Sequence, residues 1–170
     1  MIVIVAGVAG SGKTTVGTQL ASRLGWRFAD ADSFHPAANV AKMRAGIPLT
    51  DEDRAPWLRA ITGWMDDIDA LGESGVITCS ALKRRYRDQL LDGRPAATMV
   101  FLEVSKDVLV RRLSHRLGHF FPEKLLDSQL AAVEPPAPDE RVLVLPVDGD
   151  PAQMVTEIVT RLGLDTRPTT

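Results

Sequence analysis

The sequence predicts an α/β fold built on a five-stranded, mainly parallel sheet flanked by helices. Three observations predict it: five short apolar runs rich in β-branched residues, helical patterns between them, and one glycine-rich turn directly after the first run. Strands that alternate with helices pair in parallel, because each helix returns the chain to the same end of the sheet. The five runs are IVIVA (2–6), WRFAD (26–30), VITC (76–79), TMVFLEV (98–104) and RVLVLPV (141–147).

Capping residues mark the ends of two helices. Ser105 precedes a helical pattern that runs toward Gly118, and its hydroxyl is suited to accept a hydrogen bond from a first-turn N–H. Asp150 followed by Pro151 opens the last helix, because proline fits the first helical position. We expect this helix to stop near Gly163.

Length and composition indicate one globular domain. The chain has 170 residues, 45% of them hydrophobic and 25% charged, which is enough to bury a core on both faces of a sheet. The proline-rich stretch at 134–140 is a short loop, and no internal repeat is present. We therefore expect a single domain over residues 1–170.

Charge and cysteine content exclude several classes of protein. A formal net charge of −2 argues against a general binder of nucleic acid or membrane surfaces, whose affinity depends on excess Lys and Arg. The single cysteine, Cys79, cannot form an internal disulfide. The first apolar run is short and lacks a basic lead, and no run has membrane-spanning length. These features predict a cytoplasmic protein.

The stretch GVAGSGKTT, residues 7–15, fits the phosphate-binding P-loop in full. Its glycines permit positive φ and bring several backbone N–H groups into one hollow, Lys13 can reach the outer phosphates of a nucleotide, and the Thr14 hydroxyl can bind Mg²⁺. A GTPase would also need an Asn-Lys-x-Asp motif, whereas the chain has a single asparagine, Asn39. The stretch therefore predicts a phosphate-binding site with a hydroxyl suited to Mg²⁺, and the GTPase class is excluded.

Two carboxylates follow the second predicted strand. Asp30 and Asp32 lie two residues apart, so they share a face while the strand continues. We expect Asp30 to belong to the Mg²⁺ shell and Asp32 to act as a base or orienting group for a substrate hydroxyl. The alternative is capping of the helix that follows, for which Ser33 would also serve.

The next segment adds a histidine and an arginine. His35 is suited either to hydrogen-bond a polyol or to pack in a turn before proline. Thr50 or Asp51 caps a helix whose first turn is acidic. Capping does not explain Arg54, because a cation is unfavourable near a helix N-terminus. We expect Arg54 to bind an anionic ligand such as a carboxylate; a surface ion pair is the alternative.

Two basic segments follow the third and fourth strands. In CSALKRRYRD (79–88), Lys83 and Arg87 have i, i+4 spacing and are the expected anion contacts, with the other arginines in solvent. In VRRLSHRLGHFFP (110–122), Arg112 and Arg116 share the same spacing before an aromatic segment. An arginine-bearing lid near 117–131 would supply positive charge and exclude water during phosphoryl transfer. The alternative is an ordinary basic last turn of a helix.

Several of these segments together resemble one family. They are GVAGSGKTT, FADADSFHPAANVAKMRAGIPLTDEDRAPWL, ITCSALKRRYRDQL, FLEV and RLGHFFPEKLLDSQLAAVEPP, and they cover most of residues 2–136. The chain resembles the gluconokinases, small P-loop kinases related to shikimate and adenylate kinases. The resemblance implies ATP, Mg²⁺, D-gluconate as acceptor, 6-phospho-D-gluconate as product, and a homodimer.

The residue patterns and the resemblance together give a set of expected site residues. The catalytic residues would be Lys13, Asp32 and Arg116, and Mg²⁺ would be held by Thr14 and Asp30. The nucleotide would be bound by Gly7, Val8, Ala9, Gly10, Ser11, Gly12, Lys13, Thr14, Thr15, Arg112 and Arg116. The acceptor would be bound by Asp32, His35, Arg54, Lys83, Arg87 and His119.

Two positions depart from the family pattern, and two other functions stay open. Ala9 stands where Ser is common and Ala31 where Gly is common. Ala9 keeps its backbone donor, whereas Ala31 does not readily adopt positive φ, which affects the orientation of Asp32. The alternatives are a kinase for another small hydroxy acid, such as shikimate, and a non-catalytic ATP-binding regulatory module.

Overall fold

The computed structural model describes residues 1–117 and 123–164, with the backbone alone described at 113–117 and 123–126. All five predicted strands form, each within one residue of its predicted ends. The elements in chain order are β1 (Ile2–Ala6), α1 (Lys13–Leu24), β2 (Arg27–Asp30), the 3₁₀ turn η1 (Ala31–Phe34), α2 (Ala37–Arg44), α3 (Asp51–Ala70), β3 (Gly75–Cys79), α4 (Arg84–Leu91), β4 (Ala97–Glu103), α5 (Lys106–Leu117), α6 (Glu123–Ala132), β5 (Val142–Pro146) and α7 (Pro151–Arg161).

The strands form one sheet in the order β2-β3-β1-β4-β5, and every neighbouring pair is parallel. The expectation of a mainly parallel sheet is confirmed. The chain leaves β1 toward β2 on one side and later crosses to β4 on the other, so β1 lies at the point where the strand order reverses. In open α/β sheets ligands bind at the carboxyl ends of the strands at such a point.

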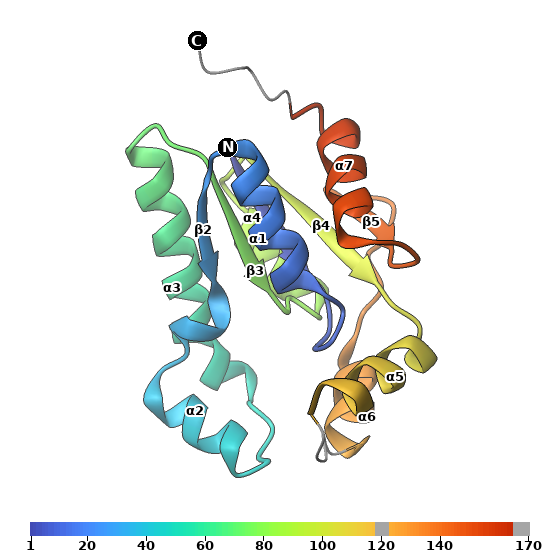
Figure 1. Cartoon of the computed structure of the whole chain (residues 1–170). Helices are drawn as coiled ribbons and strands as arrows, with labels where there is room; N and C mark the ends of the chain where they lie inside the picture. The colour runs from blue at the N-terminus through green and yellow to red at the C-terminus, as the bar shows by residue number, and fades with distance from the viewer. Residues whose placement is uncertain (118–122, 165–170) are drawn as a thin grey trace.

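Helices cover both faces of the sheet (Figure 1). In β1 the side chains alternate between the faces: Ile2 and Ile4 pack with α3 and α4, whereas Val3 and Val5 pack with α1 and α7. All five residues of β1 are buried, as expected for a central strand of a parallel sheet. Helices α2, α5 and α6 lie beyond the carboxyl edge of the sheet (Figure 1).

The predicted capping residues occupy their expected places. Thr50 caps α3, with its hydroxyl accepting from the Asp53 N–H and the Asp53 carboxylate accepting from the Thr50 N–H. Asp150 caps α7 with Pro151 at the first helical position. The Ser105 hydroxyl accepts from the N–H of Val108 in the first turn of α5. No helix in the described part of the chain is long and apolar enough to cross a membrane.

Candidate active site

The loop between β1 and α1 has the geometry of a phosphate cradle. Gly10 and Gly12 adopt φ values of 79° and 94°, in the left-handed region that favours glycine. Gly7 is equally required, because a Cβ there would lie 2.8 Å from the Ser11 hydroxyl oxygen and 3.1 Å from the Leu102 carbonyl oxygen. The described residues provide no side-chain cap and no acidic group in the first turn of α1, so its N-terminus suits an anion.

The first charged residues of the site meet at the carboxyl ends of β1, β2 and β3. These residues are Lys13, Asp30 and Asp32. All three lie close enough to the buried thiol of Cys79 to interact with it electrostatically. Burial is the main reason that the pKa of Cys79 is raised to about 12; the Lys13 charge opposes the rise and the two carboxylates support it. The structure thus brings together three residues that the sequence predicted for the site.

The two carboxylates have different surroundings. Asp30 caps η1, since its Oδ1 accepts from the Asp32 N–H at 3.0 Å. The capping alternative concerned α2, which begins after Pro36 and, in the described part of the chain, has no side-chain cap. The Asp32 side chain is exposed. Ala31 is buried and does not have positive φ, because within the described residues Ala81 alone among non-glycines has it. The departure at position 31 therefore imposes no backbone strain on Asp32.

The described residues contain no cluster of three or more His, Cys, Asp or Glu side chains that could hold a metal ion. A cation in this site would depend largely on the oxygens of a bound nucleotide, as is usual for Mg²⁺ in phosphoryl transfer. The exposed Thr14, in the first turn of α1, and the half-buried Asp30 are suitable oxygen donors for such an ion. The residues present therefore fit a magnesium–nucleotide complex.

His35 packs between the site and the core. Its ring stacks on Trp57, with centroids 4.5 Å apart and 8° between the planes. The indole N–H of Trp57 donates to the carbonyl of Ala31 at 2.6 Å, which fixes the buried ring. Burial lowers the pKa of His35; the charge of Asp32 opposes this effect and that of Arg54 adds to it. His35, Asp32 and Arg54 are therefore neighbours.

Arg54 and Lys83 lie at the same aromatic ring. The guanidinium carbon of Arg54 is 5.7 Å from the centroid of Tyr86, and the Lys83 ammonium is 5.8 Å from it. Arg54 also donates to the carbonyl of Leu49 at 2.6 Å. Among the described residues no acidic side chain pairs with Arg54, so the expected alternative of a surface ion pair is not observed. Lys83 lies 3.6 Å from an Asp51 carboxylate oxygen.

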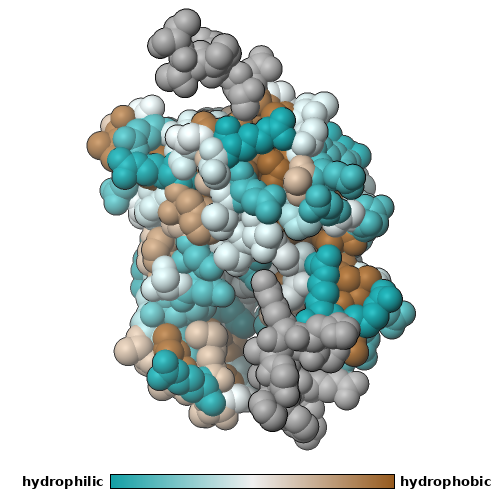
Figure 2. Space-filling view, in the orientation of Figure 1, coloured by the Kyte–Doolittle hydropathy of each residue, from teal (hydrophilic) through white to brown (hydrophobic). Residues whose placement is uncertain are grey.

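The nucleotide side of the site includes α5. Arg112 lies against the phosphate loop, where its Nη1 donates to the carbonyls of Ser11 at 3.1 Å and Gly10 at 3.4 Å. The side chain of Arg116, His119 and part of the predicted lid lie outside the described residues. Figure 2 shows a mainly hydrophilic recess in the surface beside the α2 side of the molecule.

Comparison with known proteins identifies the family. A model of the shikimate kinase family matches residues 9–161. The gluconokinase of Gluconobacter oxydans is 47% identical, over 92% of this chain and 88% of the relative. A probable gluconokinase of Xenopus tropicalis is 46% identical, over 93% of this chain and 91% of the relative. The chain belongs to the gluconokinase family. It is therefore a kinase, as the sequence predicted.

A solved structure supports the same assignment. The crystal structure of a gluconokinase from Sinorhizobium meliloti superposes with a TM-score of 0.86 at 43% identity, covering 95% of this chain and 91% of that one. The P-loop kinase fold predicted from the sequence is thus confirmed. The roles of individual residues in this gluconokinase-family chain stay predictions, supported by their positions.

Arg87 does not fit its predicted role. Its side chain is fully buried and forms a bidentate ion pair with Glu140, with distances of 2.7 and 2.9 Å. Its remaining terminal nitrogen donates to the carbonyls of Ala81 and Leu82. These contacts do not support the prediction that Arg87 contacts the acceptor. The i, i+4 argument fails because α4 begins at Arg84, so Lys83 is the residue before the helix.

The other arginines of this segment stay at the surface as expected, with acidic partners. Arg84 pairs with Asp139 and Asp88, and Arg85 pairs with Asp51. The hydroxyl of Tyr86 donates to the same Asp51.

Sequence reasoning missed four residues around the site. Trp57 and Tyr86 are aromatic residues on buried helix faces, a pattern that local sequence does not distinguish from ordinary core. Gln129 contacts the phosphate loop at Ala9, which is 120 residues away in the chain. Glu134 contacts Arg84, next to Lys83, which is 50 residues away. No short-range sequence pattern predicts contacts of this kind.

Proposed function

We propose that the protein transfers the γ-phosphoryl group of ATP to a hydroxyl group of D-gluconate and forms 6-phospho-D-gluconate. The observation that carries this proposal is the position of Arg54, which is half-buried, lacks an acidic partner in the described part of the chain, and shares the Tyr86 ring with Lys83. Two cations so placed suit the carboxylate of a sugar acid. The named relatives are a gluconokinase and a probable gluconokinase.

The phosphate loop would bind the nucleotide through its backbone N–H groups and Lys13. Thr14 and Asp30 would hold Mg²⁺, which supplies positive charge to the phosphate oxygens. Arg112 would stabilise the loop from α5, because it already donates to two of its carbonyls. Arg116, one turn further along α5, would contact the transferring group and stabilise its charge in the transition state.

The acceptor would lie between η1, α3 and the N-terminus of α4. Asp32 would accept the proton of the attacking hydroxyl, and His35, held by Trp57, would orient the polyol. A lid over residues 117–131, including His119, would close over the site and exclude water. The cytoplasmic location and the homodimer stay predictions from the sequence.

A coupled assay of ADP formation tests the proposal. The purified protein is offered ATP and Mg²⁺ with gluconate, other aldonates and shikimate in turn. We expect the highest kcat/KM with gluconate and no turnover with shikimate. A higher kcat/KM with shikimate would show that shikimate, and not gluconate, is the acceptor. ATP binding without turnover of any acid would indicate a regulatory module.

A further inference from the structure

The loop that carries Lys83 has a strained backbone. It connects β3 to α4, and within it Ala81 adopts a φ of 42°. Among the described residues no other non-glycine has positive φ. A residue with a Cβ keeps this conformation only where its surroundings enforce it, and such positions are enriched at functional sites.

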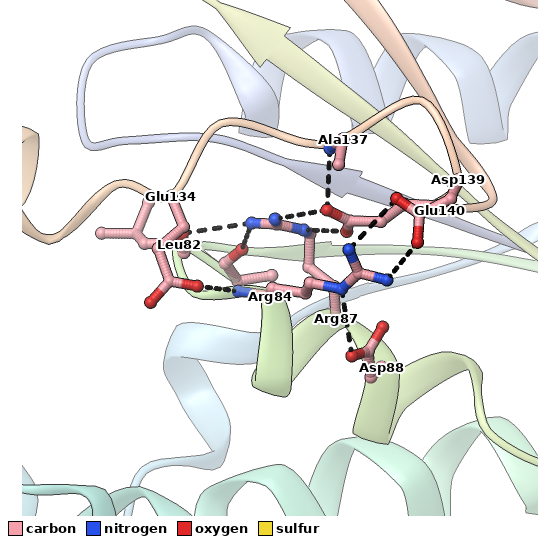
Figure 3. Close-up of polar contacts among 9 residues, drawn as sticks. Leu82, Arg84, Arg87, Asp88, Glu134, Ala137, Asp139 and Glu140 are labelled. Carbon is pink, nitrogen blue, oxygen red and sulfur yellow. Dashed lines mark hydrogen bonds and ion pairs between the residues drawn. The ribbon is translucent and has the colours of Figure 1, made fainter.

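Arg87 fixes one side of this loop. Its buried guanidinium donates to the carbonyl oxygens of Ala81 at 3.3 Å and Leu82 at 3.1 Å. Glu140 neutralises its charge and is itself held by the N–H of Ala137 at 2.9 Å. Figure 3 shows this arrangement. Arg87 therefore has a positioning role in place of the substrate contact predicted for it.

Glu134 fixes the loop on both sides of Lys83. Its backbone N–H donates to the carbonyl of Leu82 at 2.9 Å. Its carboxylate accepts from the backbone N–H of Arg84 at 2.9 Å, a contact that Figure 3 shows. Lys83 precedes α4 without a side-chain cap of its own, so the Glu134 carboxylate satisfies a first-turn donor of that helix. A negative charge is also favourable at a helix N-terminus.

Glu134 also connects this loop to α6. It is the second residue after the end of α6 at Ala132. The residue between them, Val133, packs in a small apolar cluster with Val8 of the phosphate loop and Leu82 of the Lys83 loop. The end of α6 therefore packs where the phosphate loop and the Lys83 loop meet.

We infer that Glu134 is a positioning residue for the acceptor, which orients the Lys83 ammonium by fixing the backbone on either side of it. The inference rests on the proposed function, because Lys83 is taken to bind the carboxylate of gluconate. Glu134 itself does not need to touch either substrate.

Glu134→Ala tests the inference by comparing two KM values. We expect the KM for gluconate to rise about 5- to 10-fold, the scale of one charge-assisted hydrogen bond, and the KM for ATP to change less than twofold. Asp139→Ala is the matched control. Among the described residues the Asp139 side chain binds only the guanidinium of Arg84, at 3.1 and 2.6 Å, so both KM values should be unchanged. Glu134→Gln keeps an oxygen that can accept from Arg84 and should restore most of the affinity.

A double-mutant cycle separates positioning from a general structural effect. If Glu134 acts through Lys83, the KM for gluconate of Glu134→Ala/Lys83→Met should equal that of Lys83→Met alone. Additive effects, or an equal rise in both KM values of Glu134→Ala, would overturn the inference. If Glu134→Ala does not fold, Glu134→Asp gives the same test, because its carboxylate is one carbon further from Arg84. If the wild type does not phosphorylate gluconate, the proposed function fails alone, and the same cycle is run with the acid that it does phosphorylate.

Discussion

The side-chain carbonyl of Gln129, in α6, accepts a hydrogen bond from the backbone N–H of Ala9, in the phosphate loop, at 2.9 Å. The two residues are 120 positions apart. The next residue of α6, Leu130, packs in the same cluster as Val8 and Leu109. Helix α6 therefore supports the loop that we expect to bind the triphosphate, through one polar and one apolar contact.

Loss of the Gln129 contact should weaken nucleotide binding. Gln129→Ala leaves the Ala9 amide without its partner and the loop less ordered, so the KM for ATP should rise about 3- to 10-fold, the scale of one hydrogen bond. Steady-state kinetics with ATP and gluconate varied separately would measure it. Ser128→Ala, an exposed neighbour on the same helix, is the control and should have no effect. An unchanged KM for ATP in Gln129→Ala would contradict the supporting role.

Lys13 should be needed for turnover and not for folding. It is half-buried at the start of α1, and no acidic side chain of the described residues pairs with it, so its charge is available to a phosphate. Lys13→Ala should lower kcat about 10²- to 10³-fold, with an unchanged thermal midpoint. Arg23→Ala, at the far end of α1, removes a contact with Thr156 and should keep normal turnover. Near-normal kcat in Lys13→Ala would refute the assigned role.

Arg54 should distinguish the two substrates. Arg54→Ala removes the cation proposed to pair with the acceptor carboxylate, so the KM for gluconate should rise about 30- to 150-fold, equivalent to ~2 to 3 kcal/mol. The KM for ATP should change much less. Arg59→Ala removes an exposed cation from the same helix and serves as the control. Equal effects on both KM values would assign Arg54 to the nucleotide or to the fold.

Asp53 should make stability depend on pH in the acid range. Hydrogen bonds from the Lys42 ammonium, at 2.8 and 2.9 Å, and then from the Thr50 N–H lower the pKa of Asp53 from 3.8 to about 2. A carboxyl group whose pKa is lower in the folded state stabilises the fold above its unfolded pKa. This contribution should be complete above about pH 4 and lost as the pH falls through about 2.

Urea unfolding of the wild type and Asp53→Asn at pH 7, 4, 3 and 2 measures this dependence. We expect Asp53→Asn to be less stable at pH 7, and the difference between the two proteins to shrink between pH 4 and pH 2. Because Asp53 joins α2 to α3, the same loss should affect the segment that carries Arg54. A constant difference across this range would show that ionisation of Asp53 does not contribute.

Local sequence was sufficient where the structure follows from local rules. The phosphate loop depends on glycines that permit positive φ, and Gly10 and Gly12 have it. The Asp150–Pro151 and Thr50 caps follow from hydrogen bonds within one turn. Arg54 was singled out because its charge opposes the dipole of its own helix, which is also a local argument.

The sequence by itself determined the strands, the helices between them, the phosphate loop and the identity of the polar residues that follow the strands. Only the tertiary structure decided which of these residues share a site and which are buried supports. Arg87 and Lys83 are two cations of one sequence segment, and the sequence gives them the same predicted role. In the structure Arg87 is buried and paired with Glu140, 53 residues further along the chain, whereas Lys83 lies at the Tyr86 ring. The physical reason is that burial of a charged side chain is costly unless an opposite charge pairs with it. Which residue provides that charge depends on how the whole chain folds.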